Sequence, residues 1–422
     1  MTNPTTITLK KISGFNEACG KELEKRDYMD TVMRQIATKY NYCEISLPII
    51  EDARAYAEEF VGNSPWPEWN EKGCFFFQIT NYLDTYLEGN EQSVILIPEG
   101  TVSVTRWLAN QLEQTPNLPF PVKLFYSLNC YRNELLSSLS TTKRREFRQF
   151  GLEILGSSSP QSDAEILSII GVMLSELGIP IGNIRIRLND IRIFEKLTRE
   201  CGISAKHIVE LKSLLDRIAE ARVGKHAQTL QHNTNTVYEI LQQYHLDEGT
   251  AACWKTIVEH KDYVLGGFVD CFDASYHPYF DLLLSYKEEV EKIGLNVCID
   301  PCVIRSHEYY TGISFEIDVV TEACNYLEIA GGGRYDRLVG KFLAEKDGRT
   351  IPCTGFAFGI ERVLELMNHL NCFDSEKSYT RNYNFGADCM DIVLPDASLS
   401  TYMCAFQNVV DFPANIKFKE DE

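Results

Sequence analysis

Two apolar segments separated by a polar loop decide the fold: Val122-Lys-Leu-Phe-Tyr-Ser-Leu-Asn-Cys-Tyr131 and Arg145-Glu-Phe-Arg-Gln-Phe-Gly-Leu-Glu-Ile-Leu155. Their composition predicts two strands joined as a hairpin by a Ser/Thr-rich loop. Successive side chains of a strand point to opposite faces, so one face of the second strand carries Phe147, Gln149, Gly151 and Glu153. This polar face is suited to the floor of a pocket. A half-solvated antiparallel sheet produces the same alternation, so the strand alone leaves both interpretations open.

The flanking sequence predicts a mixture of helices and strands. Apolar spacing indicates helices at 21–40, 101–112 and 160–178, and strands at 93–97, 184–188, 295–299 and 313–319. Residues 42–51 predict a short strand that leads through Pro48 into a loop. Residues 204–262 are polar and helical, and we expect an inserted helical module whose charges form a solvated face. Strands on both sides of such an insert favour an α+β fold with an antiparallel sheet.

Composition narrows the classes of function. The 422 residues include 41 Lys and Arg against 60 Asp and Glu, a net charge of −19, which argues against broad, sequence-independent binding to nucleic acid. The 14 cysteines are scattered and form no Cys-x-x-Cys pair, which favours buried thiols in a reducing compartment. The sequence shows neither an apolar leader nor a run of membrane-spanning length. We therefore expect a cytoplasmic protein that does not enter a membrane.

Three arginines stand at the ends of predicted strands, next to turns: Arg132, Arg305 and Arg362. The planar guanidinium matches phosphate and carboxylate groups better than the Lys ammonium does. A single arginine in such a position is usually part of a surface salt bridge. Three of them favour a shared anion site.

Two further motifs are ambiguous from the sequence alone. The triplet 331–333 is all glycine and matches neither a P-loop nor a dinucleotide-binding motif, so it predicts either a tight turn or close backbone approach to a ligand. His307 stands beside two tyrosines, but no candidate nucleophile lies nearby, and we expect a structural or peripheral role.

The order of these motifs resembles that of class II aminoacyl-tRNA synthetases. The first motif of that class is similar to Tyr42-x-Glu-Ile-x-x-Pro48-x-x-Glu51, the second to the segment 131–153, and the third to Gly355-Phe-Ala-Phe-Gly-Ile-Glu-Arg362. Within the class, the histidyl-tRNA synthetase family is indicated by Pro98-Glu-Gly-Thr101, Arg305-x-x-x-Tyr-Tyr-Thr-Gly312 and Gly332-Gly-Arg-Tyr-Asp336.

The resemblance covers roughly residues 10–370 and implies a domain organisation. It implies an antiparallel sheet of six or seven strands flanked by helices, and a homodimer formed through the first motif. The catalytic core would comprise 1–200 and 263–370, the helical insertion 201–262, and a short tail 371–422, the remnant of an anticodon-binding domain.

The resemblance also assigns roles to residues on the amino-acid side of the site. The implied amino-acid-binding set is Glu99, Thr101, Gln149, Glu153, Tyr309, Tyr310 and Tyr335. Glu99, Thr101 and Gln149 would hold the ammonium group. Glu153 and Tyr310 would bracket the imidazole, and the other two tyrosines would line the pocket.

On the nucleotide side, the implied ATP-binding set is Arg132, Glu134, Lys143, Phe147 and Arg362. Phe147 would stack on adenine, and Arg362 would cover the adenine and reach the γ-phosphate. Arg132 would bind the α-phosphate and the amino acid carboxylate, while Glu134 and Lys143 would steady the rest of the triphosphate. Arg305 would contact the α-phosphate, so the catalytic set is Arg305, Arg132 and Arg362. ATP and Mg²⁺ are the expected cofactors, and no residue is assigned as a metal ligand.

The sequence departs from the family pattern near the pocket and in the tail. Ile97 replaces an Arg, Ser306-His307-Glu308 replaces Gly-Leu-Asp, and the segments 135–142 and 324–327 are unusual. The 52 residues after Leu370 include a strand-like stretch at 389–395 and carry nine acidic against four basic residues, a poor surface for an anticodon stem.

We therefore predict ATP-dependent activation of histidine or a related amino acid, with tRNA as acceptor left open. Two alternatives remain: a silent, histidine-sensing regulatory subunit of ATP phosphoribosyltransferase, or an enzyme that passes the activated amino acid to another acceptor.

Overall fold

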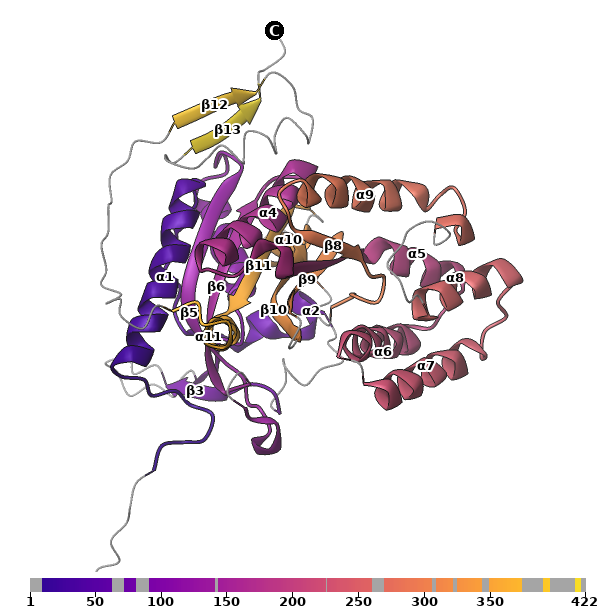
Figure 1. Cartoon of the computed structure of the whole chain (residues 1–422), viewed down its shortest axis with the longest axis horizontal. Coiled ribbons are helices and arrows are strands. Elements are labelled where there is room, and N and C mark those ends of the chain that lie inside the picture. Colours follow the sequence, from indigo (N-terminus) through magenta and orange to yellow (C-terminus); the bar gives the residue numbers. More distant parts are fainter. Residues whose placement is uncertain are drawn as a thin grey trace, which may run out of the picture.

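A mixed sheet forms the centre of the molecule (Figure 1). The computed structural model describes residues 10–62, 72–80, 91–140, 143–224, 226–259, 269–305, 309–321, 325–343, 349–373, 390–394 and 414–418. In these residues the sheet has eight strands, in the order β1 (Cys43–Glu44), β5 (Val122–Tyr131), β6 (Glu146–Leu155), β11 (Cys353–Gly359), β10 (Asn325–Arg334), β9 (Ile313–Val320), β7 (Ile184–Asp190) and β8 (Asn296–Ile299).

The six inner strands run antiparallel to their neighbours, as the sequence predicts. The short edge strands β1 and β8 pair in parallel with β5 and β7. The expected six or seven strands are therefore an undercount, because these two short segments join the edges. The short strand expected at the start of 42–51 is confirmed as β1. The loop expected after Pro48 is wrong in part, because Ile50–Asp52 form β2, which pairs in a different sheet.

The predicted hairpin of β5 and β6 is confirmed, and its register explains the glycine in its second strand. Tyr126 of β5 lies opposite Gly151 of β6. A Cβ atom on Gly151 would lie 2.3 Å from Cζ of the Tyr126 ring, so only glycine leaves room for that side chain. On the other face of β6, Phe150, Leu152 and Ile154 are fully buried in the main core.

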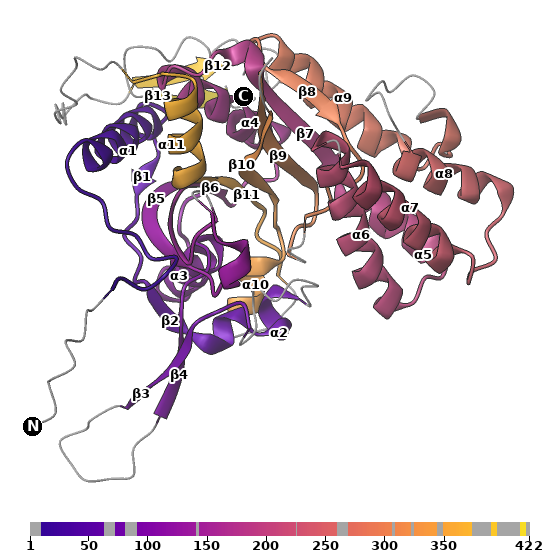
Figure 2. The same ribbon diagram turned by 60° about the horizontal axis from the view of Figure 1, so that its bottom comes forward.

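Helices cover both faces of the sheet (Figure 2). One face packs against α1 (Lys21–Lys39), α4 (Pro160–Glu176), α9 (His277–Glu291) and α11 (Ile360–His369). The other packs against α3 (Thr101–Gln114), α10 (Leu338–Phe342), and a small sheet of β2, β4 (Glu91–Leu96) and β3 (Phe76–Thr80), with α2 (Glu58–Val61) beside it. Alternate residues of β5 enter these two cores, because neighbouring strand residues point to opposite faces.

A group of helices lies beyond the β7–β8 edge, on the right of Figure 2. It consists of α5 (Ile191–Glu200), α6 (Ala205–Val223), α7 (Ala227–Leu241) and α8 (Glu248–Glu259), and the last three are the helices predicted within 204–262. Arg222 of α6 ties the group to the sheet: it donates hydrogen bonds to Asp300 Oδ1 after β8 and to the Val258 carbonyl, at 3.2 and 3.0 Å.

The described part of the tail contains the strand expected near 389–395. It is β12 (Met390–Leu394), which pairs in parallel with β13 (Ala414–Phe418). Among the described residues, no helix is both long and apolar enough to span a membrane. The described cysteines are free thiols, but the predicted burial holds for only six of them, and Cys19 and Cys43 are exposed.

Candidate functional site

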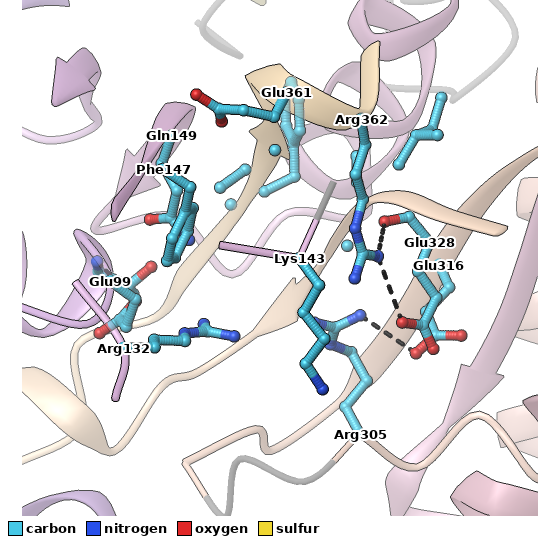
Figure 3. A pocket seen from close by; sticks show the side chains of 18 of the residues that line it. Glu99, Arg132, Lys143, Phe147, Gln149, Arg305, Glu316, Glu328, Glu361 and Arg362 are labelled. Atoms are coloured by element: carbon cyan, nitrogen blue, oxygen red, sulfur yellow. Dashed lines mark hydrogen bonds and ion pairs between the residues drawn. The ribbon is translucent and has the colours of Figure 1, made fainter. Parts of the chain in front are cut away.

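A cavity of about 400 Å³ lies over the adjacent strands β6, β11 and β10, and segments far apart in the sequence meet in it (Figure 3). Every residue that the sequence assigned to a site lines this cavity, except Glu153. The set is Glu99, Thr101, Arg132, Glu134, Lys143, Phe147, Gln149, Arg305, Tyr309, Tyr310, Tyr335 and Arg362. The polar face of β6 is thus a cavity floor, and the alternative of a half-solvated sheet does not apply.

Glu153 lies behind this lining, fully enclosed by hydroxyl groups. Its carboxylate accepts hydrogen bonds from Thr101 Oγ1 at 2.9 Å, from the Tyr335 hydroxyl at 2.5 Å and from the Tyr126 hydroxyl at 3.4 Å. Burial raises the pKa of Glu153 to about 8, although these hydrogen bonds act in the opposite direction. Gly355 makes the position possible, because a Cβ there would lie 1.7 Å from Glu153 Oε2.

Glu99 and Gln149 border the same end of the cavity and are held by the start of α3. The Glu99 carboxylate accepts the backbone N–H groups of Thr101 and Val102, both at 2.8 Å, so it caps the first turn of the helix. Gln149 Oε1 accepts the Gly100 N–H at 3.1 Å. Burial raises the pKa of Glu99, and these backbone donors oppose the rise. Both side chains are therefore fixed before any ligand binds.

Three buried tyrosines complete the enclosed end. The ring of Tyr309 lies 4.9 Å from that of Tyr310 and 6.1 Å from that of Tyr335, measured between centroids. Gly333 makes room for Tyr310, since a Cβ would lie 2.8 Å from its Cδ1 atom. This end is a small, aromatic-walled pocket with fixed carboxylate and amide acceptors.

Arg132 and Phe147 lie together near the middle of the cavity. The Arg132 guanidinium carbon is 5.1 Å from the centre of the Phe147 ring, within the range of a cation–π contact. Arg132 also donates from Nε to the Pro98 carbonyl at 3.2 Å. A flat ligand that stacked on Phe147 would share or replace this contact.

Arg305 has an unusual backbone and an unusual neighbour. Its φ is 55°, in the left-handed region that non-glycine residues seldom adopt. Nη1 donates to Glu316 Oε1 at 3.3 Å, and Nε is buried with no hydrogen-bond partner among the described residues. A Cβ on Gly331 would lie 1.9 Å from Nη1, so the strand passes close under the guanidinium.

The glycine triplet is therefore not a turn, and that prediction is wrong. All three glycines lie inside β10, paired on both sides with β9 and β11. A Cβ on Gly331 would meet the Arg305 guanidinium, whereas Cβ atoms on Gly332 and Gly333 would first meet the backbone carbonyls of Gly355 and Ile313, at 2.2 and 2.4 Å. The alternative, close backbone approach to a ligand, stays a prediction, and Gly331 lines the cavity.

Arg362 and Lys143 line the other end of the cavity and are paired with acidic residues. Arg362 Nη1 donates to the Glu328 carbonyl at 2.5 Å and lies 3.5 Å from Glu328 Oε2. Lys143 Nζ lies 3.3 Å from Glu134 Oε2. Together with Arg305, they give this end several cations, each with a carboxylate beside it.

Sequence reasoning assigned no site role to five acidic residues of the cavity lining: Asp216, Glu220, Glu316, Glu328 and Glu361. Asp216 and Glu220 of α6 line the cavity, which corrects the expectation that the charges of 204–262 form only a solvated face. Burial and then Glu316 raise the pKa of Asp216, while desolvation and the nearby Glu328 raise that of Glu220 to about 7. Their spacing of four residues indicates a shared helix face, but no sequence signal shows which face meets a cavity.

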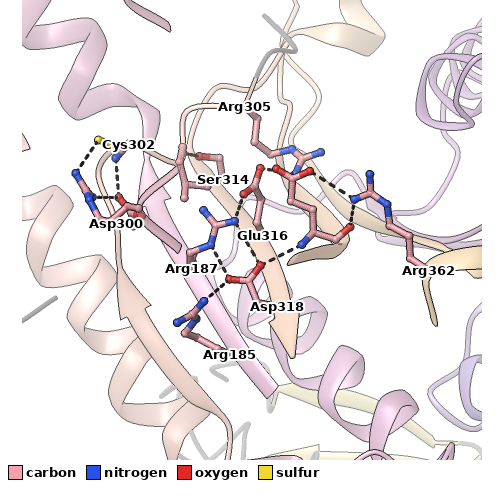
Figure 4. A network of polar contacts seen from close by, with 12 residues as sticks. Arg185, Arg187, Asp300, Cys302, Arg305, Ser314, Glu316, Asp318 and Arg362 are labelled. Atoms are coloured by element: carbon pink, nitrogen blue, oxygen red, sulfur yellow. Dashed lines mark hydrogen bonds and ion pairs between the residues drawn. The ribbon is translucent and has the colours of Figure 1, made fainter. Parts of the chain in front are cut away.

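A network of buried ion pairs lies next to the arginine-lined end of the cavity (Figure 4). Arg187 of β7 is fully buried; it donates to Asp318 Oδ2 at 2.8 Å and to Glu316 Oε2 at 2.5 Å. Burial raises the pKa of Glu316 to about 7, an effect that Arg187 opposes. Glu316 thus bridges Arg187 and Arg305. His307 and its neighbours at 306 and 308 lie outside the described residues.

Comparison with known proteins identifies the family. The profile of the histidyl-tRNA synthetase family matches residues 85–363, about two thirds of the chain. The chain belongs to this family. Histidine--tRNA ligases of Sulfolobus acidocaldarius and Sulfurisphaera tokodaii are 28% and 29% identical to it. These alignments cover 85% and 86% of this chain and 75% and 76% of the relatives.

Solved structures in the histidyl-tRNA synthetase family share the fold. A histidine--tRNA ligase subunit from Alicyclobacillus acidocaldarius has a TM-score of 0.62 at 20% identity, with 87% of this chain and all of that chain covered. An ATP phosphoribosyltransferase regulatory subunit/histidyl-tRNA synthetase from Bacillus halodurans has a TM-score of 0.64 at 16% identity, with 99% and 95% covered. The class II synthetase fold predicted from the sequence is confirmed.

Proposed function

We propose that this protein activates histidine with ATP, forming histidyl-adenylate and releasing pyrophosphate. The observation that carries the proposal is the convergence of Arg132, Arg305 and Arg362 in one cavity with an enclosed, aromatic-walled amino-acid pocket. Family membership supports it.

The reaction needs positioned charge more than it needs a protein nucleophile. A carboxylate oxygen of histidine forms a bond to the α-phosphorus, while the bond from that phosphorus to the bridging oxygen breaks and pyrophosphate leaves with the electron pair. Both reactants are anionic, so guanidinium groups that hold them together lower the barrier. Arg132 and Arg305 would act at the α-phosphate, and Arg362 would bind the γ-phosphate.

The enclosed end suits histidine. Glu99 and Gln149 offer carboxylate and amide oxygens to the ammonium group. A neutral imidazole presents one N–H and one lone pair. The Glu153 carboxyl, whose pKa is raised to about 8, lies behind the cavity lining and accepts the hydroxyls of Thr101 and Tyr335, so one of these hydroxyls would have to turn away for Glu153 to meet the imidazole. Thr101, Tyr309, Tyr310 and Tyr335 would close the pocket around the ring.

The nucleotide would lie along the open part of the cavity. Phe147 would stack on adenine, with Glu134 and Lys143 beside the β- and γ-phosphates. Mg²⁺ bound to a nucleotide usually takes one or two carboxylates and fills its shell with phosphate and water oxygens. The described residues contain no preformed cluster of three or more metal-binding side chains, but Asp216 and Glu220 fit this requirement and would hold the ion. When bound, the ion would neutralise part of the negative charge of the phosphates.

The wider organisation is also part of the proposal. The catalytic core would comprise 1–200 and 263–370, with 201–262 as a helical insertion that reaches the cavity and 371–422 as a tail. A homodimer through the first motif is supported by Ile49 and Ile50, which are 42% and 37% exposed. The free thiols support a cytoplasmic location. tRNA is the simplest acceptor of the activated histidine, and transfer to a different acceptor is the alternative.

One observation favours a second candidate, a histidine sensor of the ATP phosphoribosyltransferase regulatory type. Arg305 and Arg362 are both paired with carboxylates inside the cavity, as in a pocket that binds the amino acid but no triphosphate. Against it, a sensor requires no set of three arginines. The resemblance to the Bacillus halodurans structure concerns the fold alone.

Amino-acid-dependent exchange between ATP and labelled pyrophosphate, run with each of the twenty amino acids, separates the candidates. The proposal predicts exchange with histidine and little with the others. Histidine binding without exchange would select the sensor. Exchange without charging of tRNA would select a different acceptor.

A further inference from the structure

The carboxylate of Glu328 lies against Arg362, one of the arginines that line the cavity. It lies beside the Arg362 guanidinium, and the Glu328 carbonyl also accepts from the same Nη1 atom. Both side chains are partly exposed to the cavity, 26% for Glu328 and 38% for Arg362. The pair is therefore within reach of a ligand.

The local backbone directs Glu328 to this place. The pairing of β10 with β9 is irregular between Tyr326 and Ala330, and Glu328 in that interval has a φ of 49°. Its N–H donates to Asp318 Oδ1 at 3.0 Å, which anchors the bulge to the buried network. Bulges of this kind commonly redirect a side chain next to an active site.

Glu328 differs from the neighbouring Glu316 in how strongly it is held. Glu316 is 4% exposed and bridges two guanidinium groups, those of Arg187 and Arg305. Removing it would disturb a buried network. The ion pair of Glu328 with Arg362 is a long contact of 3.5 Å, and the Glu220 carboxyl lies within hydrogen-bonding reach of Glu328. Because Glu328 is partly exposed and its contact with the cation is long, it is the carboxylate that a polyphosphate can displace.

We propose that Glu328 determines the anion affinity of this end of the cavity: it occupies Arg362 in the absence of ligand and is displaced when a polyphosphate binds. The proposal rests on the proposed function only in identifying that polyphosphate as ATP. The carboxylate weakens binding of any polyphosphate, and the backbone carbonyl of Glu328 keeps Arg362 in place when the carboxylate leaves.

The test is isothermal titration of the full chain with inorganic tripolyphosphate in EDTA, which leaves out both adenine and metal. Glu328→Gln removes the charge and keeps the shape and the backbone contact. Like charges about 4 Å apart in a water-like medium repel by about 1 kcal/mol, so the variant should bind at least about fivefold more tightly than wild type. Glu288→Gln, an exposed carboxylate on α9, is the matched control and should leave the affinity unchanged.

A second variant guards against a folding defect. Glu328→Gly also removes the carboxylate and accepts the positive φ readily, so it should fold and show the same gain. In an Arg362→Gln background, the gain from Glu328→Gln should disappear, because the two residues act on one site.

Affinities of both Glu328 variants within twofold of wild type, or weaker than wild type, would overturn the proposal, as would a gain that persists without Arg362. Tighter tripolyphosphate binding in a protein that shows no histidine-dependent exchange would support this inference and remove the proposed function. Exchange with unchanged tripolyphosphate affinity would do the reverse.

Discussion

Replacing Gly331 with alanine would place a methyl group where the Arg305 guanidinium lies. The added Cβ would be 1.9 Å from Arg305 Nη1 and 2.5 Å from Cζ. Contacts of this kind need about 3 Å or more, so the guanidinium must move by about 1 Å. A misplacement of about 1 Å in a reacting group can cost about 10²-fold in rate. Complete loss of such a contact costs about 2.7–4 kcal/mol, or about 10² to 10³-fold.

The assay is histidine-dependent ATP–pyrophosphate exchange, with thermal unfolding measured in parallel. The clash involves the far end of a flexible side chain, so Gly331→Ala should lower the unfolding temperature only slightly while exchange falls about 100-fold. Gly182→Ala is the matched control, because a Cβ at Gly182 meets no atom within 4 Å. It should leave both measurements unchanged.

A double-mutant cycle identifies the cause. If Gly331 acts by placing Arg305, then Gly331→Ala added to Arg305→Ala should cost almost nothing further. The reasoning is refuted if folded Gly331→Ala exchanges within about threefold of wild type. It is also refuted if the same loss appears on top of Arg305→Ala.

Two other predictions concern stability. The folded pKa of Glu153, about 8, lies above its unfolded value, so the free energy of unfolding should fall as pH rises from about 4.5 through 8. Glu153→Gln should flatten this part of the pH profile in thermal melts. An unchanged slope would contradict the argument that burial raises this pKa. Arg187→Met removes one of the two cations that each of the buried carboxylates Glu316 and Asp318 contacts, and it should cost about 3 kcal/mol in denaturant unfolding. Arg54→Met, at a side chain 83% exposed, should cost little, and equal effects would show that the network adds nothing.

Much of the fold follows from local pattern. The alternation along β6 predicts which side chains face the cavity, because strand geometry fixes that period. Arginines at strand ends anticipate that Arg132, Arg305 and Arg362 meet in one cavity, since the ends of neighbouring strands meet at common edges. Motif order then extends these local predictions to the whole sheet.

The parts that sequence could not supply depend on pairing between distant segments. In the sequence, Arg187 stands at a polar position of an alternating strand, where an exposed side chain is expected. It is nevertheless fully buried, because Glu316 of β9 lies opposite it on β7 and supplies a charged partner. Glu328 reaches Arg362 only because of a bulge with a positive φ, which no composition signal marks. The period of α6 gives its apolar stripe, but its docking decides that Asp216 faces the cavity.

Formation of the intermediate tests the central claim most directly. The purified protein would be incubated with histidine, Mg²⁺ and ATP labelled in the α-phosphate, with pyrophosphatase present and no tRNA, and the labelled adenylate that remains bound would be counted after rapid gel filtration. The account predicts close to one histidyl-adenylate for each chain in wild type and a large loss in Arg305→Ala. Absence of bound adenylate in a wild-type protein that binds histidine would contradict it.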